Sequence, residues 1–239
     1  KLSFKTAASE AAAEKMSLSS AGLLTVTGGV TMTGTTPTLT IGDAGAEDTK
    51  LVFDGNAQDY HIGLDDSADS LVIGLGSALG TTTHMSFDAT GAILKPLQPA
   101  CWVYNSNATQ SISSGAYTTL EFNAEQFDNN GDWDTSNYTF TCPVAGKYHI
   151  DLVVSFNAGE LSTNTRNSFT MQAGGTTFVE AFGSPSGAND RFSVSQSIVR
   201  EFDADDAITF AVNFGTDDAD IWNVSSPNIF TWASIYLVG

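Results

Sequence analysis

Hydrophobic and polar residues alternate with a period of two over much of residues 99–239, and this period is typical of half-buried β-strands. In residues 148–156 the apolar positions are Tyr148, Ile150, Leu152, Val154 and Phe156. In residues 207–214 they are Ile208, Phe210, Val212 and Phe214. We therefore expect a compact all-β globular head over residues 99–239.

The closing segment, residues 229–238, is apolar on both of its alternating faces. In an antiparallel protein, both faces of such a strand must be shielded from water. A second sheet can cover one face, and a partner subunit is a candidate for the other. The pattern predicts a trimer interface formed by Ile229, Trp232, Ile235, Tyr236 and Leu237.

Residues 21–98 are built differently, from short apolar pieces such as "KLVFDG", "YHIGLDD" and "LVIGLG". Each piece ends in Gly or in an Asp-rich turn, as meandering β structure does. No piece has enough apolar surface for a core of its own, so association with neighbouring repeats or chains is expected. We predict a fibrous, intertwined, trimeric β shaft at 21–98. Residues 1–20, rich in Ala and Glu, form a short helix-prone segment.

The formal net charge of −18, with only nine Lys and Arg residues, narrows the choice of partners. No two basic residues are adjacent, so the sequence has no basic patch to neutralise phosphates. We exclude nucleic acid, and anionic membranes for the same reason. No apolar run reaches the ~18 residues that span a bilayer, and no signal peptide is present. The chain begins without Met, which indicates a fragment or a processed product.

Few residues are candidates for metal binding or for a reactive thiol. "DNNGDWD" (128–134) places oxygens at alternate positions like a calcium loop, but Trp133 and Thr139 replace the expected Gly and Glu. We interpret it as an inter-strand turn and expect no cofactor, with calcium or another divalent cation as the alternative. Threefold symmetry would also allow copies of His61 or His84 to bind a metal. Cys101 and Cys142 are either bridged or two core thiols.

No catalytic residues are expected. The sequence contains no nucleophile-elbow motif. The carboxylate pairs lie in turns, where nothing argues for the burial and raised pKa that glycoside hydrolysis requires. The protein is therefore expected not to be an enzyme.

The best candidate for binding is "GTDDADIWNVSSPN" (215–228), which we expect to be an acidic loop, with Trp222, between two strands. A Trp ring near carboxylates and amides suits carbohydrate stacking with hydrogen bonds. The alternative is that Trp222 packs into the rim of the head. A second loop, "FGSPSGANDR" (182–191), is rich in Gly, Ser and Asn. The candidate receptor-binding residues are Asp217, Asp218, Asp220, Trp222, Asn223 and Asn189.

The stretch "FNAEQFDNNGDWDTSNYTFTCPVAGKYHI" (122–150) resembles the signature of C1q/TNF-like jelly-roll heads. The matching positions, with the family's spacing, are Phe122, Asp128, Trp133, Phe140, Gly146 and Tyr148. Ile150 and Leu152 depart from the pattern, where the family prefers aromatic residues. The resemblance covers residues 100–239 and implies a jelly-roll β-sandwich that assembles into a compact homotrimer. It does not imply a ligand.

Residues 48–93 resemble repeats of tail-fibre and related structural proteins of marine bacteriophages, and "EKMSLSSAGLLTVTG" (14–28) resembles a short fibre unit of those proteins. Shaft plus trimeric head is how such fibres are commonly built. We therefore expect a homotrimeric phage virion fibre that is assembled in the host cytoplasm. Its head would bind a host-surface glycan or protein, and its N-terminus would contact other virion proteins.

Three alternatives compete with this interpretation. The first is a purely structural virion component, such as a head fibre or decoration protein. The second is a tailspike enzyme, which would need clustered buried carboxylates and a long solenoid, and the sequence shows neither. The third is a secreted C1q-like lectin, against which the shaft repeats argue.

Overall fold

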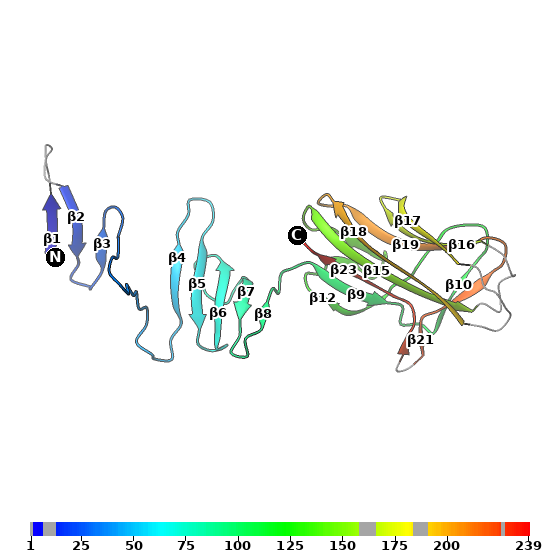
Figure 1. Ribbon diagram of the computed structural model, residues 1–239, viewed down its shortest axis with the longest axis horizontal. Helices are drawn as coiled ribbons and strands as arrows, with labels where there is room; N and C mark the ends of the chain where they lie inside the picture. The colour runs from blue at the N-terminus through cyan, green and yellow to red at the C-terminus, as the bar shows by residue number, and fades with distance from the viewer. Residues whose placement is uncertain (1, 7–12, 158–165, 184–190, 226–227) are drawn as a thin grey trace. The chain divides into compact units, whose positions relative to one another are not determined.

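The computed structural model describes residues 2–6, 13–157, 166–183, 191–225 and 228–239, and every regular element in these ranges is a β-strand (Figure 1). The chain divides into two compact units, Lys1–Thr49 and Lys50–Gly239. The all-β class expected from the sequence is confirmed for the described residues.

The first unit contains a three-stranded antiparallel sheet of β1 (Leu2–Thr6), β2 (Ala13–Leu18) and β3 (Leu24–Val26). The helix expected within residues 1–20 is wrong for Ala13–Leu18, and residues 7–12 lie outside the described residues. Met16 lies opposite both Phe4 and Val26. These cross-strand apolar pairs outweigh the helix propensity of Ala and Glu.

The second unit begins with a five-stranded antiparallel sheet, whose strands lie side by side in chain order. They are β4 (Thr49–Phe53), β5 (Tyr60–Asp65), β6 (Ser70–Leu75), β7 (Thr83–Phe87) and β8 (Ile93–Leu94). Turn chemistry sets the connections: the Asp88 carboxylate accepts hydrogen bonds from the backbone N–H groups of Thr90 and Ala92. All five strands of this sheet pair with neighbours from the same chain.

The head is a sandwich of two antiparallel sheets (Figure 1). The seven-stranded sheet contains β9 (Ala100–Tyr104), β10 (Thr109–Ile112), β12 (Ala124–Asp128), β15 (Gly146–Asn157), β18 (Arg191–Phe202), β20 (Ala219–Trp222) and β23 (Trp232–Leu237). The six-stranded sheet contains β11 (Thr118–Thr119), β13 (Trp133–Asp134), β14 (Thr139–Thr141), β16 (Asn167–Ala173), β17 (Thr176–Gly183) and β19 (Ala207–Phe214). A separate ribbon joins β21 (Val224–Ser225) to β22 (Asn228–Ile229).

The long strand β15 pairs with three other strands of the seven-stranded sheet. It pairs with β18 along one side, and with β23 and then β20 along the other. β9 lies beyond β23, so β23 is an interior strand. This placement explains why the closing segment is apolar.

The core lies between the two sheets and includes the aromatic residues of the spaced motif. Phe122, Phe140 and Tyr148 have no exposed surface, and Trp133 is 4% exposed. The Asp128 carboxylate accepts hydrogen bonds from the backbone N–H groups of Asn130, Gly131 and Trp133. It therefore closes a turn, as the sequence predicts.

Cys101 and Cys142 are buried free thiols, so of the two alternatives the disulfide is excluded. Burial, with a smaller contribution from Asp206, raises the pKa of Cys142 to about 12. Both cysteines act as small core residues rather than reactive groups.

Candidate functional site

The outer face of the seven-stranded sheet, which points away from the core, carries a cluster of large aromatic side chains. On β9, Cys101 and Val103 point inward, so Trp102 and Tyr104 point outward. Their rings lie 6.0 Å apart, and Trp102 lies 5.8 Å from the ring of Trp232 on β23. All three residues are half-buried. We call Trp102, Tyr104 and Trp232, together with Tyr236, the aromatic face.

A polar network adjoins the aromatic face on β15, β18 and β23. The Oγ of Ser197 lies 3.1 Å from Nε2 of His149, whose Nδ1 lies 3.3 Å from a carboxylate oxygen of Asp151. Ser234 donates a 3.4 Å hydrogen bond to the same carboxylate. The ring of His149 also lies 4.8 Å from that of Tyr236.

This order of serine, histidine and aspartate has the connectivity of a hydrolase triad, but acyl transfer also needs preorganised donors for an oxyanion. Ser197 lies within β18, which pairs with β15 over twelve consecutive residue pairs. Successive backbone N–H groups of an extended strand point to opposite sides, so β18 does not direct two neighbouring N–H groups at one oxyanion. The network is therefore better suited to orienting side chains on the sheet than to catalysis.

The residues predicted for the trimer interface separate into two groups. Trp232 and Tyr236 lie on the outer face, and Tyr236 is 43% exposed. Ile235, in contrast, is fully buried in the sandwich, and Leu237 packs against the core. The assignment of Ile235 and Leu237 to the trimer interface is therefore corrected. The residues on one face of β23 pack in the protein's own core, and only the other face is accessible to a partner.

Ile229 was assigned to the closing strand, and the structure corrects this too. It lies in β22 and pairs with Val224 in the separate ribbon. Phe230 and Thr231 separate this ribbon from β23, and the buried hydroxyl of Thr231 donates to the carbonyl oxygen of Trp222. A register that runs continuously from Ile229 to Leu237 therefore does not exist.

In the acidic segment at 215–228, residues 219–222, 224–225 and 228 lie in strands, so Trp222 belongs to a strand and not to a loop. Within β20, Ala219 and Ile221 are buried, so Asp220 and Trp222 point outward. Asp220 accepts a 2.5 Å hydrogen bond from the Ser111 hydroxyl, and Asp218 accepts a 2.7 Å bond from the backbone N–H of Ser114. Asp218 and Asp220 line a shallow hollow of about 320 Å³ beside β10.

Trp222 is half-buried, and its ring lies 6.5 Å from that of Phe230. Asp217, half-buried, accepts a 3.2 Å hydrogen bond from the Thr216 hydroxyl. Asn223 is only 1% exposed, so its assignment to a receptor-binding surface is corrected. Asn189 lies outside the described residues.

The two histidines considered as metal ligands have different surroundings within the five-stranded sheet. His61 is fully buried, and its Nδ1 lies 2.9 Å from the carbonyl oxygen of Gly76. His84 makes an edge contact with Tyr60 at 6.1 Å. Among the described residues, no group of three His, Cys, Asp or Glu side chains is arranged to hold a metal ion.

Sequence reasoning missed Trp102, Tyr104, His149 and Ser197 as parts of one surface. The alternation in "CWVY" (101–104) was a usable signal for the outward position of Trp102. The juxtaposition itself depends on the pairing of strands that are more than a hundred residues apart, such as β9 with β23. Local periodicity does not specify that pairing.

No protein-family model matches the sequence, and no curated protein matches it. Among the described residues, no helix is long and apolar enough to cross a membrane. Solved structures that resemble part of the chain are domains of the C1q and TNF type.

The globular domain of the zebrafish complement 1qA protein is 15% identical, with a TM-score of 0.44, and covers 59% of this chain and 98% of its own. Eiger TNF from S. frugiperda is 11% identical, with a TM-score of 0.46, and covers 59% of this chain and 93% of its own. Murine APRIL at pH 8.5 is 12% identical, with a TM-score of 0.43, and covers 59% of this chain and 99% of its own.

Proposed function

We propose that this chain is the subunit of a homotrimeric virion fibre of a bacteriophage, and that its head binds a receptor on the host surface. The aromatic face is the observation that carries the proposal. Trp102, Tyr104 and Trp232 form one connected group on the open side of a sheet whose other side is already buried. Clusters of large aromatic side chains that are only half-buried on a sheet surface mark interaction surfaces.

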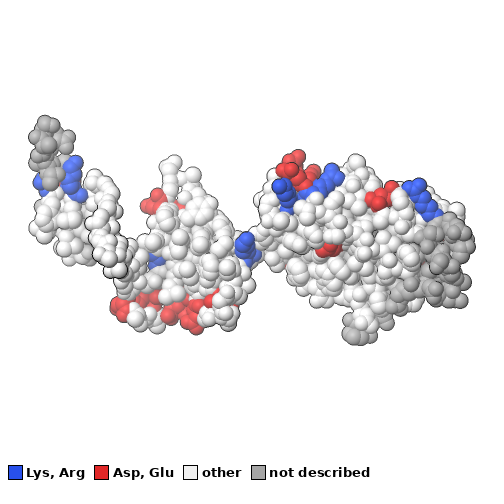
Figure 2. Space-filling model, viewed as in Figure 1, with Lys and Arg blue, Asp and Glu red and all other residues white. Residues whose placement is uncertain are grey.

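The charge of the chain favours a copy of itself as the partner of the aromatic face. At a net charge of −18, copies approach most easily where carboxylates are few. Figure 2 shows Asp and Glu side chains in separate groups on the head, with uncharged surface between them. The carboxylate beside the aromatic face is that of Asp151. It lies 3.3 Å from the ring of His149 and accepts a hydrogen bond from Ser234. A subunit contact there would bury rings rather than unpaired charge.

Receptor binding is assigned to the surface around Trp222. Its ring, the ring of Phe230 and the hydroxyl and carboxylate groups of Ser111 and Asp220 lie on or beside β20. An aromatic ring next to hydrogen-bonding groups is the combination that binds sugar rings. Three heads on one fibre would add avidity to a weak single contact. The phage and virion assignment, including attachment through the N-terminus, rests on the likeness of the shaft sequence to tail-fibre repeats.

Two measurements on the full chain test the proposal. Light scattering gives the assembled mass, and a glycan array reports sugar binding. We expect a mass three times the 25.1 kDa of one chain and saturable glycan binding. The variant Trp102→Asp should lower the assembled mass, while Phe182→Asp, at an exposed position on β17 of the other sheet, serves as the matched control. A trimer that binds no glycan or cell surface would favour the purely structural virion component. A monomer would refute the proposal.

A further inference from the structure

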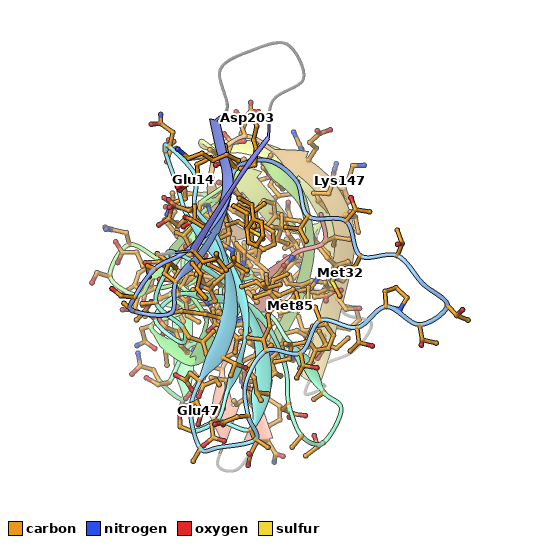
Figure 3. All side chains as sticks on the ribbon, turned by 90° about the vertical axis from the view of Figure 1, so that its left-hand side faces the viewer. Glu14, Met32, Glu47, Met85, Lys147 and Asp203 are labelled. Atoms are coloured by element: carbon orange, nitrogen blue, oxygen red, sulfur yellow. The ribbon has the colours of Figure 1, made fainter. Side chains whose placement is uncertain are left out.

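The five-stranded sheet β4–β8 has two faces of opposite character, and the strand registers define them. Residues directly opposite each other in an antiparallel pair share a face. Tyr60 lies opposite Leu75, Ile62 opposite Ile73, and Leu64 opposite Leu71. The same face continues through Met85 and Phe87 of β7 to Ile93 of β8. Met85 is labelled in Figure 3. We call this set of nine residues the bare face; all are aliphatic or aromatic.

The opposite face is covered by the chain itself. It carries His61, which is fully buried, and Val72 and Ser70, which are 3% and 7% exposed. The segment 76–82 lies over this face: Gly76 bonds His61, and Gly80 lies close to the Asp65 carboxylate. The centre of this covered face is therefore shielded by the chain itself, whereas Leu94 at its β8 side is 51% exposed.

β4 extends the bare face by two more residues. The ammonium group of Lys50 donates a 2.6 Å hydrogen bond to the carbonyl oxygen of Ser77, in the covering segment. Lys50 is therefore on the covered face, and alternation places Leu51 and Phe53 on the bare one. They are 45% and 55% exposed.

The bare face leaves more contiguous apolar surface in contact with water than soluble single chains usually do. Tyr60, Leu64, Leu71, Phe87 and Ile93 are between 37% and 58% exposed. Of the 27 large hydrophobic residues that are exposed in the described part of the chain, 20 lie before residue 98, where Val72 alone is a buried hydrophobic residue. Monomeric proteins rarely leave contiguous apolar surface of this extent open to water.

The bare face also lacks charge, while the turns around it are acidic. Asp65, Asp66 and Asp69 lie at the β5–β6 turn, and Asp88 lies at the β7–β8 turn. Figure 2 shows acidic side chains gathered along one edge of this part of the chain. Copies of an acidic chain can meet at an uncharged surface that is flanked by carboxylates, which remain in water.

We propose that the bare face packs against the same face of other copies of this chain, so that the hydrophobic core of the shaft lies between subunits and not within one. The inference rests on the proposed homotrimer and specifies how its shaft is held together. Each subunit contributes a complete sheet, so assembly requires packing of finished sheets rather than the intertwining expected from the sequence. The covered face, with Lys50 and the segment 76–82, points outward to solvent.

Site-specific photo-cross-linking in the full chain tests the inference. A benzophenone side chain replaces Leu71, at the centre of the bare face, or Thr81, exposed in the covering segment. We expect irradiation to give covalent dimers and trimers from position 71 and none from position 81. Light scattering on the same samples reports the assembled mass independently.

The outcomes separate the inference from the proposed function. A trimer without intersubunit cross-links at position 71, or with equal cross-linking at both positions, would overturn the inference and leave the trimeric head standing. A monomer would overturn both. As a second measurement, Leu71→Asp should increase hydrogen exchange of residues 60–94 at least tenfold, while Thr81→Asp should not. Unchanged exchange in Leu71→Asp would also count against a shared core.

Discussion

The indole nitrogen of Trp133 donates a 2.9 Å hydrogen bond to the main-chain carbonyl oxygen of Phe122, inside the core of the head. The ring of Trp133 also stacks on Phe210 at 6.2 Å. One side chain thus joins β13 to the segment before β12 and to β19 of the same sheet. This explains why a tryptophan occupies the middle of the spaced motif.

Replacing Trp133 by Phe should destabilise the head by about 2–4 kcal/mol. The change leaves the buried carbonyl of Phe122 without its donor and opens a small cavity. Denaturant unfolding followed by fluorescence measures the loss. Trp102→Phe, on the outer face, is the matched control and should cost less than half as much. Equal losses would show that the indole hydrogen bond contributes little.

How far the sequence predicts this structure depends on the range of each interaction. Period-two alternation identifies β15 and β19, and the burial of Phe122, Trp133, Phe140 and Tyr148 follows the spaced motif. The closing strand shows the limit. Its residues are apolar on both faces, but alternation alone does not say which face meets the core, and Ile235 proved to be inside.

The candidate site was less predictable than the fold, because it is composed of residues that are far apart in the sequence. Trp222 was expected in a loop, but Ile221 next to it is fully buried, which makes that segment a strand. The network of His149, Asp151 and Ser197 depends on the pairing of β15 with β18. Single-sequence patterns contain no information on that register.

Substituting Gly74 by Ala should destabilise the five-stranded sheet by about 1–3 kcal/mol, as overpacking does. An added Cβ would lie 2.6 Å from the ring of His61 and 2.6 Å from the carbonyl oxygen of Thr82. The carbonyl belongs to the backbone and cannot turn aside. Hydrogen exchange of residues 60–87 measures the effect. Gly29→Ala, where the added carbon would meet nothing within 4 Å, is the control. Unaltered exchange in Gly74→Ala would contradict this close packing.

The stability of the head should decrease in acid, in part through Glu180. A hydrogen bond from the Ser168 hydroxyl, followed by that of Tyr117 and the charge of Arg166, lowers the pKa of Glu180. A lowered folded-state pKa contributes stability above the unfolded value of about 4.3. That contribution is lost as the pH falls through the folded-state value.

We therefore expect Glu180→Gln to lower the melting temperature at pH 7 and to flatten its decrease as the pH falls through the unfolded-state pKa of about 4.3 and below it. Because Glu180 is exposed, the contribution should stay below about 1 kcal/mol. Glu201→Gln, an exposed carboxylate on β18, is the control. Parallel acid profiles for the wild type and Glu180→Gln would show that the Ser168 contact does not matter.

Deleting residues 229–239 should abolish folding of the head. β23 pairs with β15 on one side and β9 on the other, so its loss divides the seven-stranded sheet and removes the buried Ala233 and Ile235. Circular dichroism and light scattering would detect the loss. Deletion of residues 1–26, which belong to the other compact unit, is the control and should leave the head folded. A soluble, cooperatively melting product of the first deletion would show that β23 is dispensable.

The last prediction concerns Trp222, because its two roles would change different measurements. If its ring contacts the receptor, Trp222→Ala should weaken glycan or cell binding by about 1–3 kcal/mol and leave the melting temperature nearly unchanged. If the ring serves mainly to pack on Phe230, 6.5 Å away, the cost should appear as about 3–5 kcal/mol of lost stability. Phe230→Ala is the matched variant, since it removes the ring contact but keeps the indole. Receptor binding by Trp222 requires that Trp222→Ala lose affinity at normal stability. Intact binding with a strongly lowered melting temperature would assign Trp222 to the fold and leave the receptor site to be found elsewhere on the head.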